Sequence, residues 1–119
     1  MPNGELRYRR GDIRWVSLDP TVGAEIRKTR SCLILQTDVM NQYGQLTVVL
    51  PFRPGHKQAP YVVNVTASAE NGLDQNRFID VAQVRSVDGQ RVLGLLGKLE
   101  DHYWSQIQTA LNIVCGFLT

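Results

Sequence analysis

The sequence contains no long run of apolar residues. None of the apolar stretches in its 119 residues approaches the roughly 18 residues that cross a bilayer as a helix. Residues 1–10 are polar and carry three arginines, so they lack the apolar segment of a secretory signal. These absences predict a cytoplasmic protein that makes no contact with a membrane.

Cysteine and histidine are also scarce, with two of each. Cys32 and Cys115 lie in apolar stretches, where a free cysteine commonly packs as a small core side chain, so we expect two buried thiols and no disulfide. Two isolated cysteines and two distant histidines, His56 and His102, form no spacing typical of a metal site. We therefore predict neither a metal ion nor another cofactor.

The chain does have 43% apolar residues, which is enough for the core of one compact domain. We expect residues 1–9 to form a flexible polar leader and residues 10–119 to form a single domain. Residues 1–60 contain nine Lys and Arg against five Asp and Glu, and residues 61–119 contain four against six, giving +4 and −2 and the total of +2. This asymmetry suits an anionic ligand that approaches one side of the molecule.

Alternating and β-branched segments predict five or six strands. The expected strands cover residues 12–18, 31–36, 46–52, 61–65, 77–84 and 91–96, with a helical turn at 38–44 and a helix over 99–117. In the last segment apolar residues recur at steps of three and four, which indicates core or interface packing. The pattern favours a mostly β (α+β) fold, a small antiparallel β-barrel with a C-terminal α-helix packed on it.

Two basic segments separate these strands. The first basic loop, residues 18–30, contains Glu25, Arg27, Lys28 and Arg30. The second basic loop, residues 53–60, contains Arg53, His56 and Lys57. The first is longer than the two to about five residues of most hairpin loops, and long loops are often functional. The residues alone leave two interpretations open, a solvated surface loop or a site for a phosphate-bearing ligand.

Several short motifs occur in an order that resembles the MazF/PemK family of toxin endoribonucleases. They are RGDI at residues 10–13, LDPTVGAE at 18–25, LILQTD at 33–38 and QVRSVD at 83–88, with Arg30 and Asn41 at matching places. Together with the closing helix, the resemblance covers nearly the whole chain. It implies an SH3-like barrel, usually a homodimer, that acts as the growth-inhibiting toxin of a type II toxin–antitoxin system.

The resemblance also implies an activity and a partner. Such toxins are sequence-selective, metal-independent endoribonucleases (mRNA interferases) that cut single-stranded mRNA to 2′,3′-cyclic phosphate and 5′-OH ends. The implied partner is a cognate antitoxin that lays an acidic, disordered tail across the two basic loops. The charge asymmetry of the chain is compatible with such an inhibitor.

Arg30 is the first candidate for a catalytic group. Metal-free RNA cleavage needs a proton removed from the 2′-OH, charge stabilised on the phosphate, and a proton for the departing 5′ oxygen. The guanidinium of Arg30 matches two phosphate oxygens but rarely gives up a proton, which favours charge stabilisation as its role. Glu25 could take a proton or orient Arg30 through an ion pair, and a carboxylate among cations favours the second role.

Arg53 marks a departure from the family pattern. Relatives usually have a Thr or Ser near the end of the third strand that assists catalysis, whereas this chain has Arg53 at that place. The Gly-Gly before Arg30 and the Pro after it are also absent. Either Arg53 takes over a phosphate contact, which makes it a second catalytic candidate, or cleavage is weakened or lost.

Eight further side chains are candidates for binding RNA. They are Arg27, Lys28, Gln36, Asn41, His56, Lys57, Gln83 and Arg85. Gln36 and Asn41 could read base edges or hold loops, and His56 could act as a base or be merely exposed. Gln83 and Arg85, expected on one face of a strand, could brace the site or form a buried polar network.

Two other functions stay open. A non-catalytic RNA-binding relative would account for the missing hydroxyl. A gyrase-poisoning toxin of the same fold would need a Trp-Gly-Ile-type tail, which the C-terminal sequence CGFLT does not supply. Substituting Arg30 distinguishes the two RNA-dependent functions, because both would lose affinity for RNA but only the enzyme would lose strand cleavage.

Overall fold

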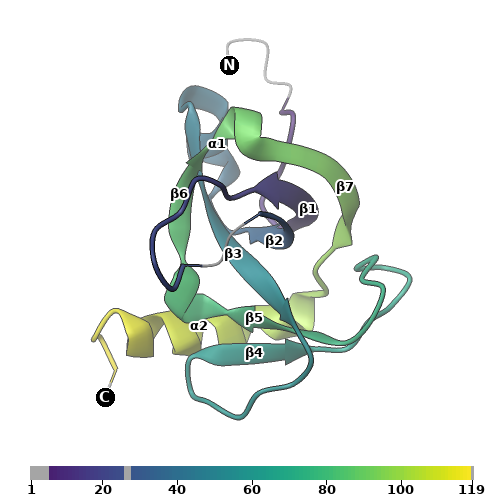
Figure 1. The fold of residues 1–119 in the computed structure, drawn as a ribbon, viewed down its shortest axis with the longest axis vertical. Coiled ribbons are helices and arrows are strands. Elements are labelled where there is room, and N and C mark those ends of the chain that lie inside the picture. Colours follow the sequence, from purple (N-terminus) through teal and green to yellow (C-terminus); the bar gives the residue numbers. More distant parts are fainter. Residues whose placement is uncertain (1–5, 26–27, 119) are drawn as a thin grey trace.

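The central strand of the molecule is β3 (Leu46–Pro54), which runs diagonally through the fold (Figure 1). The structure, a computed structural model, describes residues 6–25 and 28–118. The prediction for Arg27 therefore lies outside the described residues. β-Branched Thr47, Val48 and Val49 favour the extended backbone at the start of β3, and the strand continues to Pro54 before the chain turns.

Seven strands form one antiparallel sheet in the described part of the chain. The other six are β1 (Asp12–Ser17), β2 (Thr29–Ile34), β4 (Val62–Val65), β5 (Arg77–Asp80), β6 (Arg85–Asp88) and β7 (Val92–Lys98). Neighbours follow the order β4-β5-β3-β2-β1-β7, and β6 pairs with the first half of β3. The second end of β3 pairs with β5 instead. A single strand therefore belongs to both parts of the sheet.

The predicted antiparallel sheet with a C-terminal helix is confirmed, but the predicted closure into a barrel is wrong. β4 and β7 stand at the two ends of the strand order, and no ladder joins them within residues 6–25 and 28–118. β7 curves around β1 on one side, whereas β4 lies on the side of the C-terminal helix (Figure 1). The two strands that would have to pair thus lie in separate parts of the fold.

The helical segments are short. They are α1 (Asp38–Tyr43), the 3₁₀ turns η1 (Val81–Gln83), η2 (Gly89–Arg91) and η3 (Asp101–Tyr103), and α2 (Trp104–Val114). The predicted helix over 99–117 is therefore shorter at both ends. Gly116, at a φ of +83°, allows the backbone to turn out of α2, and the N–H of Phe117 donates to the Asn112 carbonyl at 2.8 Å. No helix in the described residues is long and apolar enough to span a membrane.

The core consists of two clusters on opposite faces of β2. Leu33 packs with Leu50 and with Ile107 of α2 in the first cluster. Cys32 and Ile34 belong to the second cluster, which lies beneath the start of the first basic loop and includes Leu18. Successive strand residues point to opposite faces, so both faces of β2 are covered. This burial explains the continuous apolar sequence of the strand and gives its first residues a rigid anchor.

The prediction of a single strand over residues 77–84 is wrong. β5 ends at Asp80, the turn η1 follows, and β6 begins at Arg85. The turn is held by a hydrogen bond of 3.1 Å from the N–H of Val84 to the carbonyl of Val81. Both strands pair with β3, and the turn carries the chain from one end of β3 to the other.

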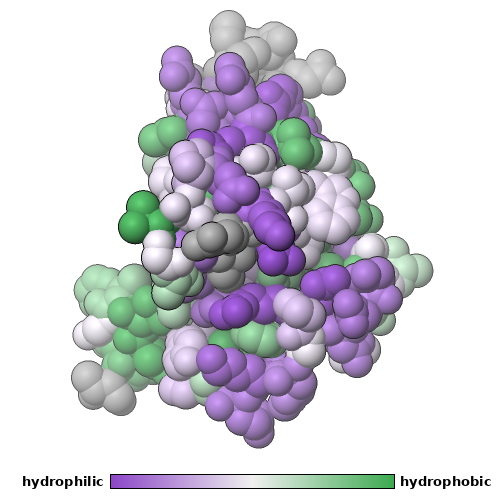
Figure 2. Space-filling model, in the orientation of Figure 1, coloured by the Kyte–Doolittle hydropathy of each residue, from purple (hydrophilic) through white to green (hydrophobic). Residues whose placement is uncertain are grey.

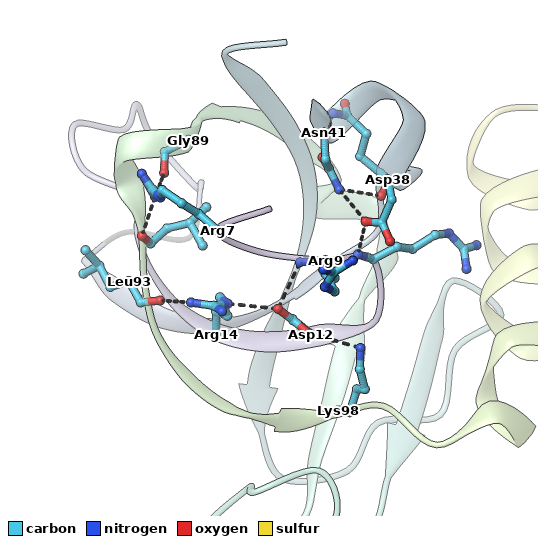
Figure 3. Close-up of polar contacts among 12 residues, drawn as sticks. Arg7, Arg9, Asp12, Arg14, Asp38, Asn41, Gly89, Leu93 and Lys98 are labelled. Atoms are coloured by element: carbon cyan, nitrogen blue, oxygen red, sulfur yellow. Dashed lines mark hydrogen bonds and ion pairs between the residues drawn. The ribbon is translucent and has the colours of Figure 1, made fainter. Parts of the chain in front are cut away.

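The last residues of the predicted leader pack on the sheet. Tyr8 is buried, and the guanidinium of Arg7 donates to the backbone carbonyl at the start of η2 at 2.7 Å (Figure 3). Asp12 is also buried and makes ion pairs with Arg14 at 3.1 Å and with Lys98 at 3.4 Å (Figure 3). The RGD segment therefore fixes the beginning of β1 against β7.

The two cysteines are free thiols in different environments. Cys32 is buried as predicted, and burial raises the pKa of its thiol to about 12 although the nearby charge of Arg85 acts to lower it. Cys115 is exposed, so the prediction of a second buried thiol is wrong. The apolar stripe of α2 leaves the core near its end, where Leu111 is half-buried and Val114 is exposed.

Glu100 closes a polar network between the loop after β4 and the start of η3. Its carboxylate accepts hydrogen bonds from Ser68 at 2.7 Å and from Asn71 at 3.1 Å. Burial acts to raise the pKa of Glu100, but the hydrogen bonds from Ser68, its own backbone and Asn71, with the nearby charge of His102, leave that pKa below its usual value. The ionised carboxylate thus stabilises the folded chain.

We expect Glu100→Gln to reduce the free energy of unfolding by about 1 kcal/mol at neutral pH, because hydrogen bonds to a charged acceptor are replaced by neutral ones. A carboxyl whose pKa is lowered by folding stabilises the protein above its unfolded pKa, and this stabilisation is lost as the pH falls through the folded pKa. The difference between the two proteins should therefore shrink below the usual glutamate pKa of 4.5. Urea unfolding at several pH values measures it, and a difference that stays constant into acid would contradict the role of the charge.

Candidate functional site

The first basic loop leaves and re-enters the sheet at a narrow stem. Ser17 at the end of β1 faces Thr29 in β2, and the next pair is Val16 with Arg30. The N–H of Leu18 donates to the Lys28 carbonyl at 2.9 Å, which adds one more bond to the ladder. Arg30 is exposed although its backbone belongs to this regular pairing. A rigid strand therefore presents its guanidinium at the base of the loop.

Two arginines from distant parts of the sequence hold the entry of this loop. Arg85 in β6 donates from Nη1 to the carbonyl of Leu18 at 3.3 Å. Arg91 in η2 donates to the carbonyl of Ser17 at 3.1 Å and also to that of Asp19. The carbonyls of residues 17–19 therefore all accept hydrogen bonds from arginines of β6 and η2. Arg85 therefore contacts the loop entry, and bracing of the site, one of its two predicted roles, stays a prediction. Arg91 makes contacts that the sequence did not suggest.

Arg30 and Arg53 lie at matching ends of neighbouring strands. Cys32 faces Pro51 in the last pair of the ladder between β2 and β3, so Arg30 and Arg53 each lie two residues beyond that pair, one on each strand. Two cations placed just past the end of one ladder are candidates to address one phosphate group. We call this place, where β2 begins and β3 ends, the cationic junction.

Asp80 supplies a negative charge beside the cationic junction. Its Oδ2 lies 3.6 Å from Nη1 of Arg53, and its side chain is 7% exposed whereas that of Arg53 is 49% exposed. Asp80 is the last residue of β5, two residues beyond the partner of Arg53. This pair could not be predicted from the sequence, because it depends on the register between two strands that are far apart in the chain.

The second basic loop is held in shape by Asn64 of β4. Its amide accepts from the backbone N–H of Lys57 at 3.0 Å and donates to the carbonyl of the same residue at 2.9 Å. The ammonium group of Lys57 lies 5.2 Å from the ring centre of Tyr61, within the range of a cation–π contact. His56 is exposed. Figure 2 shows hydrophilic residues gathered over this loop, at the lower front of the molecule.

Gln36 and Asn41 fill the second of their two predicted roles, because they hold a turn. Both are buried, and Gln36 donates from Nε2 to Oδ1 of Asn41 at 2.9 Å. Asn41 donates back to the backbone carbonyl of Gln36 at 3.1 Å, and Thr47 completes the network at 2.8 Å. These amide groups tie α1 to the start of β3 through hydrogen bonds within the chain.

Three further candidates, Glu25, Lys28 and Gln83, lie in the first basic loop or in η1. Glu25 is exposed and accepts a hydrogen bond from the N–H of Val22, so it folds the first basic loop onto itself. Lys28 is exposed at a φ of 70°, at the point where the loop joins β2. Gln83 is half-buried in η1, not on a strand face with Arg85, so that shared-face prediction is wrong.

The geometry can hold a phosphodiester without further groups. Arg30 and Arg53 offer planar donors at one junction, the loop stem fixes the first of them, and Asp80 contacts the second. Donors that are oriented before a ligand arrives stabilise charge that develops on it more effectively than mobile ones. The arrangement is therefore suited to binding a phosphate and stabilising a more negative phosphorane.

Comparison with solved structures gives the fold of the toxin endoribonucleases. MazF from Deinococcus radiodurans superposes with a TM-score of 0.79 at 21% identity, over 94% of this chain and 99% of that one. An endoribonuclease of a mycobacterial species, solved in complex with its cognate antitoxin, gives a TM-score of 0.76 at 15% identity, over 94% and 98% of the two chains. These comparisons establish the fold that the chain shares with both proteins.

Sequence comparison identifies the family. Endoribonuclease EndoA of Bacillus subtilis is 27% identical over 106 residues, which cover 88% of this chain and 91% of that protein. The model of the PemK-like, MazF-like toxins of type II toxin–antitoxin systems matches residues 9–115. The chain belongs to this family.

Proposed function

We propose that this protein is a sequence-selective, metal-independent endoribonuclease that cuts single-stranded mRNA to 2′,3′-cyclic phosphate and 5′-OH ends. The observation that carries the proposal is the cationic junction, where Arg30 and Arg53 stand at matching ends of β2 and β3 between two basic loops. Curated relatives of similar length are named endoribonucleases, which supports the same activity.

The roles of the two arginines follow from their chemistry. Arg30 binds the scissile phosphate and stabilises the negative charge that grows on it when the 2′ oxygen attacks. Arg53 contributes a second set of N–H donors at the place where relatives carry a hydroxyl group. Glu25 accepts a hydrogen bond from the N–H of Val22 within the first basic loop, and its proposed role is to orient Arg30 through an ion pair, because a carboxylate among cations is a weak base. The substrate has to be unpaired, because the major groove of an RNA duplex is closed to side chains.

The remaining candidates supply affinity. Lys28, His56 and Lys57 are exposed on the two basic loops and suit contacts with neighbouring phosphates. Arg85 and Gln83 act from beneath, through the loop entry and η1. Such contacts make binding weaker as salt rises. Arg27 belongs to the same loop in sequence and is proposed for the same purpose.

A cognate antitoxin and a second copy of this chain are the proposed protein partners, and the cytoplasm is the proposed location of the protein. One solved relative is an endoribonuclease in complex with its cognate antitoxin, and an acidic, disordered tail would complement the exposed cations of both loops. Residues 10–119 would form the toxin domain. Trp15, Leu93 and Leu95 leave exposed apolar surface on β1 and β7, which suits the homodimer.

A non-catalytic RNA-binding protein is the second candidate function. One observation favours it: Arg53, which stands where relatives have the hydroxyl, already has Asp80 as a partner. In that case the cationic junction would bind RNA without activating the 2′-OH.

The decisive experiment is an incubation of purified protein with a long, mixed-sequence, single-stranded RNA in EDTA, followed by mapping of the new ends. We expect a few discrete cuts that leave 5′-OH ends and disappear in the Arg30→Ala variant, which also controls for contaminating nucleases. RNA that stays intact while it binds the protein would reject the nuclease and support the second function.

A further inference from the structure

Asp80 is a buried carboxylate whose presence the stability of the fold does not explain. Its Oδ1 is enclosed and accepts no hydrogen bond from any residue in the described part of the chain. The other oxygen, Oδ2, lies 3.6 Å from Nη1 of Arg53. Burying a carboxylate with one oxygen unsatisfied is unfavourable, and an apolar residue of the same size would cost less at this position.

The register explains why the carboxylate meets Arg53. In the ladder between β3 and β5, Arg53 faces Phe78 and Phe52 faces Ile79. Side chains two residues apart on a strand share a face, so Asp80 lies diagonally across from Arg53 on the same face of the sheet. A long cationic side chain can reach a carboxylate at such a diagonal position on the neighbouring strand.

The ion pair draws one end of the Arg53 guanidinium toward Asp80 and leaves the rest of the side chain accessible. Half of the Arg53 side chain is exposed, whereas Asp80 is almost fully enclosed, so the buried charge lies at the base of a solvent-facing group. The separation of 3.6 Å is longer than a hydrogen bond, so the two groups attract each other through their charges, and the planar guanidinium keeps its N–H donors available to a ligand. Arg53 belongs to the cationic junction, where it and Arg30 each lie two residues beyond the last pair of the ladder between β2 and β3.

We propose that Asp80 is the positioning residue of the cleavage site: it holds Arg53 in the orientation that contacts the scissile phosphate. The inference rests on the proposed nuclease function and adds a role for a residue that does not itself touch RNA. A group held in place before substrate arrives loses less freedom in the transition state, so the anchor affects the rate of the chemical step more than the affinity for RNA.

The test is a double-mutant cycle on a short single-stranded RNA that contains one mapped cut, with kcat and KM measured for each protein. Asp80→Asn keeps the size of the side chain and removes its charge. We expect it to lower kcat by about 10- to 100-fold and to leave KM within about twofold. In an Arg53→Ala background the same substitution should cause no further loss, because the residue acts through Arg53. An equal loss in both backgrounds would show a merely structural role and overturn the proposal.

Asp74→Asn is the matched control, since Asp74 makes the same kind of ion pair with Arg77 but on the exposed surface, at 3.0 Å. It should leave kcat unchanged. If Asp80→Asn does not fold, Arg53→Lys changes the pair from its exposed end. We expect this variant to keep a positive charge, lose the planar fork and lower kcat, and a kcat equal to that of the unmodified protein would overturn the proposal.

A second readout is independent of cleavage. In ¹H–¹⁵N NMR spectra the Nε–H signal of Arg53, assigned by its loss in Arg53→Lys, should move and exchange faster with water in Asp80→Asn, and stay unchanged in Asp74→Asn. An Arg53 signal that does not respond to Asp80→Asn overturns the positioning role. Failure of the unmodified protein to cut any RNA would reject the proposed nuclease function alone, and the NMR result would still decide whether Asp80 orients Arg53.

Discussion

Arg30→Ala is expected to lower RNA cleavage by about 10²- to 10³-fold or more while the protein keeps its fold. The side chain is exposed, so its removal leaves no cavity, and its backbone stays paired with Val16 in the ladder between β1 and β2. The loss would come from the transition state, because the phosphorane carries more negative charge than the bound phosphodiester. kcat should therefore fall more than the affinity for RNA does.

Arg9→Ala is the matched control for this variant. Arg9 is also an exposed arginine, and it precedes β1, whereas Arg30 faces the far end of that strand. Both substitutions remove one positive charge, so a general electrostatic effect would weaken cleavage equally in the two proteins. Cleavage by Arg30→Ala within about threefold of the unmodified rate, at equal protein stability, would exclude a catalytic role for Arg30.

Gly72→Ala is expected to reduce the free energy of unfolding by about 3 kcal/mol or more, which is enough to unfold a marginally stable domain. A Cβ at this position would lie 2.0 Å from the carbonyl oxygen of Leu96 in β7, and the backbone of Gly72 has a φ of +71°. Gly97 approaches the same loop, where a Cβ would lie 2.4 Å from the carbonyl oxygen of Glu70. Backbone meets backbone here, so no side chain can move aside.

Gly55→Ala separates the two causes of the loss expected for Gly72→Ala, which are the close backbone contact and the strain of a positive φ. Gly55 has a φ of +90°, but a Cβ there would meet no atom within 4 Å. Its substitution should therefore cost only the strain of the left-handed backbone, about 1–2 kcal/mol. Urea unfolding of both variants gives the comparison. Equal losses would mean that the close approach between the loop and β7 relaxes easily, contrary to our expectation.

Strand and helix content could be predicted from the sequence because it depends on local periodicity. The alternation around β1, the β-branched run of β3 and the stripe of α2 each indicate their element without knowledge of its neighbours. The division of residues 77–88 into β5, η1 and β6 could not be predicted in this way. Apolar side chains continue through the turn because Val81 is buried, so the pattern hides the change of direction.

The candidate site could be predicted only in part, because some of its contacts depend on how distant segments pair in the fold. Arg30 and Arg53 follow from loop charge and from the family resemblance, but Asp80 and Arg91 enter through strand register and tertiary contact. Gln36 and Asn41 show a second limit, because the sequence left two roles open for them. A polar amide beside a strand has the same sequence signature whether it faces solvent or, as here, is buried in a network that holds a turn.

The position of β3 in both parts of the sheet has a consequence for how such a toxin can be silenced. The strand carries Arg53 at one end, pairs with β2 below Arg30, and supports β6 at its other end. Loss of β3 would expose both apolar clusters at once, so it would unfold the domain and not merely open one site. We therefore expect an inhibitor of the cationic junction to act from outside the sheet, at the two basic loops.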